Sequence, residues 1–207
     1  MTISTKSNNK NKSQVKTFGC RLNLLESELI QNKLENSNNH NLLVVNTCAV
    51  TNEAEKQAKQ FIRKVSRENP EKKIIVTGCA AQINSKNWTA MPEVYKVVGN
   101  IEKLEQKTWD KEVSKETIVS NIMKETKAKI SSHYGYKGRT RAFLEIQQGC
   151  DHRCTFCIIP YGRGNSRSLD MESIIQNAKK LVDYGHKEIV LTGVDITSWG
   201  RDVDEKM

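Results

Sequence analysis

The sequence predicts an α/β protein in which helices pack on a parallel sheet. Short apolar runs suited to buried strands alternate with longer segments that repeat apolar residues at helical spacing. Such alternation is typical of a parallel sheet whose strands are connected by helices. The pattern weakens in the middle of the chain and begins again near residue 142. The 207 residues are enough for one or two domains, and this interruption predicts two.

The first unit is expected to alternate strands and helices. A helix is expected over Leu22–Leu34, because five apolar side chains in that segment share one face. The next helix is expected from Asn52, where Asn52 and Glu55 form a plausible capping box, and it should end just before Pro70. The strands are expected at Gln14–Phe18, Leu42–Asn46, Lys73–Thr77 and Tyr95–Val98.

The second unit is expected to start with a strand at Ala142–Gln148. A helix should follow, capped by Asp170 and closed by Gly185 at the C′ position, before a further strand at Glu188–Thr192. The charged stretch before this unit has no clear period and is expected to contain a mobile connection. The predicted boundaries are a disordered leader over 1–13, a first domain over 14–125, a linker over 126–140 and a second domain over 141–207.

Composition narrows the class of protein. The 33 lysines and arginines exceed the 24 aspartates and glutamates by 9, a surplus that fits a polyanionic partner, nucleic acid above all, but also a lysine-rich genomic bias. No apolar run is long enough to span a bilayer, and Met1–Gln14 has no apolar signal segment. A soluble cytoplasmic protein without membrane or DNA partners is therefore expected. In a reducing compartment six cysteines indicate metal or redox roles rather than a disulfide framework.

Three of the cysteines form the most informative motif. Cys150, Cys154 and Cys157 have C-x3-C-x2-C spacing directly after a predicted strand. Thiolates are the usual protein ligands of a 4Fe–4S cluster, so three of them would leave one iron open to a substrate or cofactor. A structural zinc site remains an alternative, although it needs a fourth ligand and His152 lies only two positions from Cys154, which would strain a tetrahedral site.

The other three cysteines share a position relative to the predicted strands. Cys20, Cys48 and Cys79 each follow a strand within a few residues, and ligands in open α/β sheets gather at the carboxyl ends of strands. A single such cysteine could be a small buried apolar residue. Three at equivalent positions favour a second three-cysteine cluster, and Gly19 and Gly78 would let the backbone approach it closely.

Several motifs together resemble the radical S-adenosylmethionine (SAM) methylthiotransferases. They are Gly19-Cys20-Arg21-Leu22-Asn23, Asn46-Thr47-Cys48-Ala49-Val50-Thr51, Gly78-Cys79, Gln148-Gly149-Cys150 through Pro160-Tyr161-Gly162-Arg163-Gly164, and Leu191-Thr192-Gly193-Val194-Asp195. The family adds a methylthio group to tRNA adenosines or to a ribosomal protein. The second and last motifs look most like the branch that acts on N6-threonylcarbamoyladenosine at position 37 of tRNA.

The resemblance implies a fold and two cofactors. It implies a flavodoxin- or Rossmann-like N-terminal methylthiotransferase domain, followed by the first β/α units of a radical-SAM partial TIM barrel. Cys150, Cys154 and Cys157 would hold the 4Fe–4S cluster that binds and reductively cleaves SAM, and the resulting radical would abstract hydrogen from C2 of the adenine. The remaining three cysteines, Cys20, Cys48 and Cys79, would hold an auxiliary 4Fe–4S cluster that delivers sulfur. An electron donor and tRNA would be the partners.

The resemblance also assigns roles beyond the cysteines, each with a simpler alternative. Phe156 would lie near the adenine of SAM, or merely pack beside the loop. Gly193 and Asp195 would meet the methionine amino group, although Asp195 could be only a cap or turn residue. Asn23 and Asn46 would support the auxiliary cluster through hydrogen bonds, or serve as turn and cap residues. Four arginines would bind tRNA phosphates, or form a solvated basic surface: Arg139, Arg141, Arg163 and Arg167.

The chain departs from the family pattern after the second β/α unit of the barrel. The family has further barrel strands and a small C-terminal β-domain, so the chain is expected to be truncated within the radical-SAM domain. An open fragment should expose an unpaired strand edge and apolar faces. The alternatives are an enzyme completed by a separate polypeptide, a non-catalytic remnant that at most binds iron–sulfur clusters, and a zinc-dependent RNA-binding module.

Overall fold

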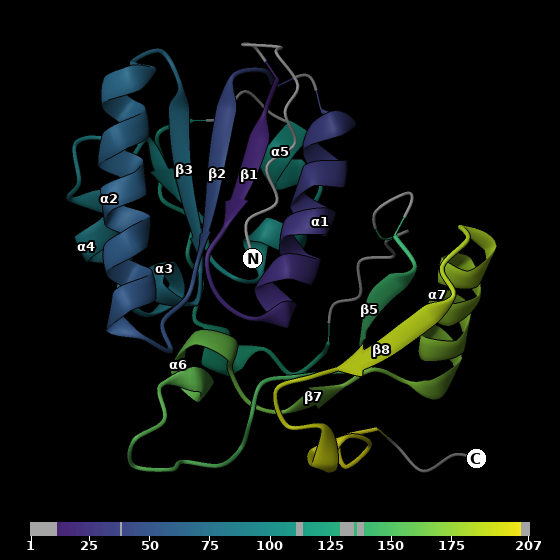
Figure 1. Cartoon of the computed structure of the whole chain (residues 1–207). Helices are drawn as coiled ribbons and strands as arrows, with labels where there is room; N and C mark the ends of the chain where they lie inside the picture. Colours follow the sequence, from purple (N-terminus) through teal and green to yellow (C-terminus); the bar gives the residue numbers. More distant parts are fainter. Residues whose placement is uncertain (1–11, 38, 111–113, 129–134, 136–138, 204–207) are drawn as a thin grey trace.

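The first unit is a parallel four-stranded sheet with strand order β1-β2-β3-β4 (Figure 1). The computed structural model describes residues 12–37, 39–110, 114–128, 135 and 139–203. The strands are β1 (Gln14–Thr17), β2 (Leu42–Thr47), β3 (Lys73–Gly78) and β4 (Lys96–Val97). All three neighbouring pairs run parallel, which confirms the α/β class predicted from the alternation of elements.

Helices cover both faces of this sheet. The helix α1 (Arg21–Glu35) lies on one side and α2 (Asn52–Glu68) on the other (Figure 1). Successive strand residues point to opposite faces, so Val44 packs in the cluster of α1 whereas Val45 packs in the cluster of α2. Every residue of β2 is buried, as expected of a strand covered on both faces.

Short helices close the two cores. Trp88 of α4 (Ser85–Thr89) and Trp109 of α5 (Lys107–Asp110) have no exposed surface and fill opposite sides of the sheet. The stretch expected to be irregular thus contributes a core tryptophan. The remaining short elements of this half are α3 (Cys79–Ile83), η1 (Glu102–Leu104) and η2 (Ile122–Lys124).

The second unit consists of two parallel strands backed by a helix. The strand β5 (Arg141–Glu145) pairs with β8 (Glu188–Thr192), and α7 (Met171–Asp183) packs on them through Leu181. Within the described residues, β8 pairs with β5 alone, and Leu191 is 53% exposed, as expected for an open barrel fragment. The shorter elements are β6 (Gln147–Gln148), α6 (Ile159–Arg163), β7 (Arg167–Ser168) and η3 (Ile196–Ser198).

The predicted strand Ala142–Gln148 is two strands rather than one. The ladder of β5 with β8 ends after Ile146 donates to the carbonyl of Thr192. The chain then pairs antiparallel with β7, because the carbonyl of Ile146 accepts instead from Leu169. The apolar run alone could not show this change of partner.

The predicted caps are right for one helix and wrong by one residue for another. Asp170 accepts from the amide of Ser173 and caps α7, and Gly185 follows its end with φ +99°, as predicted. The cap of α2 is Thr51, whose hydroxyl accepts from the amide of Ala54. The predicted capping box of Asn52 and Glu55 is therefore wrong, because the helix already includes Asn52.

Other boundaries move only slightly. The first three strands and both long helices shift by one or two residues. The predicted strand Tyr95–Val98 is reduced to Lys96–Val97, although the amides of Tyr95 and Val98 still donate to β3, and Val98 also forms a bridge with Ile118. Most of the predicted leader 1–13 and much of the predicted linker 126–140 lie outside the described residues, so the domain limits stay a prediction. None of the described helices is both long and apolar enough to cross a bilayer.

The two units meet below the carboxyl ends of the first sheet. These ends face α6 in Figure 1, and α6 contacts α3, which begins directly at the end of β3. On the other side, α1 contacts β5. The end of the sheet where Cys79 lies is therefore covered by a segment of the second unit.

Candidate metal centres

The first centre lies at the carboxyl ends of three neighbouring strands. Cys20 follows β1, Cys48 directly follows β2, and Cys79 directly follows β3. A methyl group at Gly19 would lie 2.7 Å from Cβ and 3.1 Å from Sγ of Cys48, so the loops after β1 and β2 are in contact. The three cysteines thus lie at one edge of the sheet, near enough for Cys79 and Cys20 to add to the effect of burial in raising the pKa of Cys48, while their role as cluster ligands stays a prediction.

Each of these thiols has a polar neighbour. The Sγ of Cys20 lies 3.2 Å from Oδ1 of Asn23, and the Sγ of Cys48 accepts from the amide of Val50 at 3.4 Å. The amide nitrogen of Asn100 lies 3.8 Å from Sγ of Cys79. The thiol of Cys20 is the donor to Asn23, whereas the sulfurs of Cys48 and Cys79 are acceptors, and hydrogen bonds donated to a ligand atom are typical of metal sites.

Two buried asparagines connect the loops. Asn23 donates to Oδ1 of Asn46 at 3.3 Å and to the carbonyl of Thr47 at 3.0 Å. Asn46 returns a bond to the carbonyl of Asn23 at 3.0 Å and donates to Ser27 at 3.1 Å. Both asparagines have no exposed surface. They hold the start of α1 against the end of β2 and so fix the spacing between Cys20 and Cys48.

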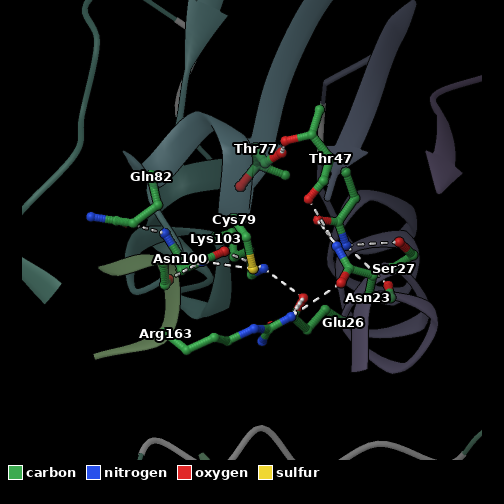
Figure 2. A network of polar contacts seen from close by, with 12 residues as sticks. Asn23, Glu26, Ser27, Thr47, Thr77, Cys79, Gln82, Asn100, Lys103 and Arg163 are labelled. Atoms are coloured by element: carbon green, nitrogen blue, oxygen red, sulfur yellow. Dashed lines mark hydrogen bonds and ion pairs between the residues drawn. The ribbon is translucent and has the colours of Figure 1, made fainter. Parts of the chain in front are cut away.

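Beneath the thiols lies a buried group of charges, shown in Figure 2. Glu26 of α1 pairs with Arg163 of α6 and, at 2.6 Å, with Lys103 of η1. The side chains of all three are at most 3% exposed. Lys103 also donates to Oδ1 of Asn100 at 2.6 Å. One carboxylate therefore faces two cations, and Arg163 crosses from the second unit to reach it.

The electrostatics of this group extend to the cysteines. Burial alone would lower the pKa of Arg163, but the neighbouring anionic forms of Cys79, Glu26 and Cys20 outweigh burial and raise it. Burial would raise the pKa of Glu26, but Arg163 and Lys103 keep it below its usual value. Glu26 is therefore ionised and Arg163 charged.

Burial shifts the pKa of three other groups near the site: Lys103, Glu145 and Cys48. Burial lowers the pKa of Lys103, and Glu26 opposes that effect only in part. Burial, with repulsion from Glu26, raises the pKa of Glu145 at the end of β5 to about 7. One carboxyl oxygen of Glu145 is buried without a hydrogen-bond partner. Burial also raises the pKa of the Cys48 thiol, and nearby Cys79 and Cys20 add to this effect.

Two of the four predicted RNA-binding arginines are corrected by the structure. Arg163 is 2% exposed and bound to Glu26, and Arg167 is 5% exposed and donates to the carbonyl of Arg163 at 2.7 Å. Neither guanidinium presents a surface to a phosphate, because both side chains are buried. Arg139 and Arg141 are exposed and pair with Glu28 and Glu188, and their binding to RNA stays a prediction.

The second centre is the loop that holds Cys150, Cys154 and Cys157. Cys154 is exposed and the other two are half-buried. The amide of Cys157 donates to the carbonyl of Cys154 at 3.0 Å, and the amide of Cys150 donates to the carbonyl of Gly164 at 3.1 Å. The bond to Gly164 holds the start of the loop, and the bond between Cys157 and Cys154 closes a turn within it.

In neither three-cysteine set do the three sulfur atoms all lie within 4.8 Å of one another. Among the described residues, the only group of three or more His, Cys, Asp or Glu with ligand atoms within 4.8 Å of one another is Cys150, His152 and Asp195. It contains one thiol. Zinc, with bonds to sulfur of about 2.3 Å, would draw its thiolates within about 4 Å of each other. A cubane binds each thiolate through a different iron, so its ligands stand further apart.

The three residues assigned to SAM lie around the second loop. The ring of Phe156 is 90% exposed, so it does not pack on the described protein. Asp195 accepts from the hydroxyls of Thr197 at 2.7 Å and Ser198, which lower its pKa. These bonds match the simpler interpretation of Asp195 as a turn residue, and its Oδ2 also lies 4.0 Å from Sγ of Cys150. Gly193 leaves room for Gln147, whose oxygens would lie 3.0 Å from a Cβ there.

Sequence reasoning missed the charges beneath the first centre. A signal was present in Glu26, which lies within the apolar stripe of its helix, one position after Leu25 and three before Leu29. A carboxylate on a buried helix face needs a cation. Nothing in the sequence pointed to Arg163 or Lys103 as that cation, since both are distant along the chain.

Comparison with known families supports this arrangement. Residues 12–100 match the family described as "Uncharacterized protein family UPF0004", and residues 144–207 match the Radical SAM superfamily. The first match contains Cys20, Cys48 and Cys79, and the second contains Cys150, Cys154 and Cys157.

Named relatives share both regions. The threonylcarbamoyladenosine tRNA methylthiotransferase MtaB of Rickettsia prowazekii is 50% identical over 93% of this chain and 45% of its own length. The MtaB of Bacillus subtilis is 39% identical over 91% of this chain and 45% of its own length. A tRNA-2-methylthio-N(6)-dimethylallyladenosine synthase of a Thermoanaerobacter species is 33% identical over 92% of this chain and 44% of its own length. The chain spans about half the length of the curated relatives it matches. These matches show that the chain belongs to the radical-SAM methylthiotransferase family, in its MtaB branch.

Proposed function

We propose that the protein takes part in transferring a methylthio group to C2 of N6-threonylcarbamoyladenosine at position 37 of tRNA, by radical-SAM chemistry. The observation that carries this proposal is the presence of two separate three-cysteine sites on one chain, one at the carboxyl ends of β1 to β3 and one after β5. The names of the relatives support the substrate class. Cytoplasmic tRNA is the partner that follows, with a separate electron donor.

The two three-cysteine sites of the chain would have different roles in the reaction. Cys150, Cys154 and Cys157 would hold one 4Fe–4S cluster and leave an iron for SAM, with Gly193 and Asp195 near its methionine amino group and Phe156 near its adenine. When bound, these groups supply the radical and, from a second SAM, the methyl group. Cys20, Cys48 and Cys79 would hold the auxiliary cluster that delivers sulfur. Arg139 and Arg141, both exposed, would contact RNA phosphates.

A separate polypeptide that completes the barrel stays part of the proposal. The side chains of Leu191 and Val182 are 53% and 58% exposed, although both belong to elements that pack the second core. A covering segment would bury them and exclude water from the SAM site. The activity of this chain should therefore be assayed with and without the second half of a relative.

The test counts iron in three forms of the chain after anaerobic reconstitution with ferrous iron and sulfide. Wild type is expected to bind about eight irons, and either triple cysteine-to-alanine variant about four. The variants are Cys20/Cys48/Cys79→Ala and Cys150/Cys154/Cys157→Ala. Circular dichroism checks that each variant is folded. The proposal fails if wild type takes up zinc instead of iron, or if either triple variant loses all its iron.

Activity is then measured by mass spectrometry of tRNA nucleosides after incubation with SAM and a reductant. A gain of a methylthio group on threonylcarbamoyladenosine, lost in both triple variants, is the expected result. Two intact clusters without any modification, even with the complementing half present, would favour a non-catalytic cluster-binding remnant. Stoichiometric zinc in the first experiment would favour the RNA-binding module.

A further inference from the structure

We propose that Arg163 is a positioning residue for the first centre: its guanidinium, delivered from the radical-SAM segment, supplies positive charge that stabilises an anionic occupant held by Cys20, Cys48 and Cys79. The inference deepens the proposed function and rests on it in one respect, that these three cysteines hold a cluster. It adds that the second unit completes the electrostatic environment of the first unit's cluster.

The geometry places Arg163 directly beneath the thiols. The carbonyl of Gly162 accepts from Asn100 at 2.6 Å, and the same amide nitrogen of Asn100 lies 3.8 Å from Sγ of Cys79. A Cβ on Gly162 would lie 3.0 Å from Cβ of Cys79. The next residue, Arg163, sends its Nη2 to Oδ1 of Asn23 at 3.2 Å, and that same oxygen lies 3.2 Å from Sγ of Cys20. Gly162 and Arg163 thus contact the polar neighbours of two of the three thiols: Gly162 contacts Asn100 beside Cys79, and Arg163 contacts Asn23 beside Cys20 (Figure 2).

The buried side chains beneath the site carry more positive than negative charge, which favours the binding of an anion there. Two buried cations, Arg163 and Lys103, share the single ionised carboxylate of Glu26. Of the other charged groups near Arg163, Glu145 carries little negative charge below pH 7, because its pKa is raised to about 7, and Arg167 is a cation with its own carboxylates, Glu125 and Asp202. A buried charge without a partner is costly. The facing groups that remain are Cys79 and Cys20.

An occupied three-cysteine site would meet that need. Three thiolates outweigh the positive charge of an oxidised cubane, so the cluster with its ligands is anionic. The cations beneath it would lower the free energy of this anion, and more so of its reduced form, which carries one more negative charge. An arginine in that place therefore affects both the retention of iron and the reduction potential.

The test uses the Cys150/Cys154/Cys157→Ala background, in which only the first centre can bind iron. Arg163→Gln removes the positive charge, whereas Glu26→Gln removes the negative charge from the same ion pair. After reconstitution, iron release to a ferrous chelator and the midpoint potential are measured under anaerobic conditions. Arg67→Gln, on the exposed face of α2, serves as the matched control.

The expected results have opposite signs. Arg163→Gln should weaken iron retention by about ten- to hundredfold, the range found when groups that support metal ligands are lost, and should make the potential more negative. Glu26→Gln should retain iron at least as well as the background and make the potential more positive. Arg163→Lys, which keeps the charge but not the forked geometry, should restore most of the potential.

Two outcomes would overturn the inference, and neither coincides with failure of the proposed function. If Arg163→Gln and Glu26→Gln lose iron equally and shift the potential in the same direction, the ion pair has only a structural role. If Arg163→Gln matches Arg67→Gln, the guanidinium has no role at the site. A background protein that binds no iron at all would instead refute the cluster on which the inference rests.

Discussion

At the scale of single residues, the buried carboxyl groups of α1 behave in two ways. Glu26, between two cations, has a lowered pKa. Glu28 is 5% exposed and has one half-exposed partner, Arg139, at 3.5 Å. Burial raises the pKa of Glu28 to about 7, and Arg139 offsets this only in part. The number of buried cations within reach, rather than burial itself, decides which carboxyl group stays ionised.

This difference predicts a pH-dependent stability that Glu28 controls. Folded Glu28 keeps its proton up to about pH 7, whereas the unfolded side chain loses it near its ordinary pKa of 4.5. The unfolded state therefore binds fewer protons between these values, and stability falls as pH rises through that window. Glu28→Gln cannot titrate and should remove this fall, so the variant gains on the order of 2 kcal/mol relative to wild type between pH 4.5 and pH 8.

Urea unfolding at several pH values measures the difference between the two proteins. Because folded Glu28 stays protonated below about pH 7, the loss of its contact with Arg139 adds only a constant offset over most of this window. Glu35→Gln, an exposed substitution on the same helix, is the control. A difference between Glu28→Gln and wild type that stays constant across the window would show that Glu28 is ionised when folded.

The sequence predicted well the position of those site residues whose residue type and spacing alone indicate their role. Cys20, Cys48 and Cys79 could be placed together because each follows a strand, and parallel strands end at one edge. Arg163 could not be placed. It lies between an apolar stretch, Ile158 to Tyr161, and a polar one, Asn165 to Arg167, without a periodic pattern, and its burial depends on the docking of two units. Pairwise contacts between distant segments leave no periodic pattern in either segment.

At the scale of elements, the junction between β3 and α3 sets the place of Cys79. Gly78 occupies it with φ +99°, and a Cβ there would overlap the backbone of Thr47. Gly185, after α7, has the same φ of +99°, but a Cβ added there would have nothing within 4 Å. Substitutions at Gly185 and Gly78 can therefore be compared: the first adds only the strain of a left-handed backbone, and the second adds that strain and a steric overlap.

Gly185→Ala should cost about 1–2 kcal/mol, the strain of a side chain in the left-handed region. Gly78→Ala should cost clearly more, because the same strain is added to an overlap with backbone atoms that cannot move without disturbing β2. Midpoints of urea unfolding measure both losses. Equal losses for the two variants would mean that β2 and β3 separate easily at this end, and that the glycine is not what brings Cys79 close to Cys48.

The elements show where periodicity suffices and where it does not. The long helices α1, α2 and α7 and the strands β2 and β3 were predicted to within two residues, because each has an uninterrupted apolar pattern. The helices α3, α4 and α6 have five residues each, too few for a period to emerge. The division of β5 from β6 depends on partners, Thr192 and Ser168, that lie in other parts of the chain.

At the scale of the whole molecule, the two units are joined by polar contacts rather than by a shared sheet. No strand of the first sheet pairs with a described strand of the second unit. The apolar clusters are also separate. The contacts between units include Glu26 with Arg163, Asn100 with the carbonyl of Gly162, and Asn23 with Arg163. Buried ion pairs depend strongly on both partners, so this interface should be sensitive to single substitutions.

Arg163→Met is therefore expected to uncouple the second unit from the first. Removing one partner of a buried ion pair costs about 3–5 kcal/mol, which corresponds to about a hundredfold or greater loss of protection from hydrogen exchange. The loss should fall on β5 and β8, since β2 and β3 keep their own apolar cores on both faces. Exchange followed by mass spectrometry on peptides from these strands measures the effect.

Arg67→Met, which replaces an exposed arginine of α2 by the same residue, controls for the substitution itself and should change neither set of peptides. If Arg163→Met reduces protection in β2 and β5 equally, the two units unfold together even without the ion pair, and the polar interface is not what couples them. If β5 is already unprotected in wild type, the second unit opens independently. Arg163 would then be held at the first centre only part of the time, too weakly to define the charge beneath its cysteines.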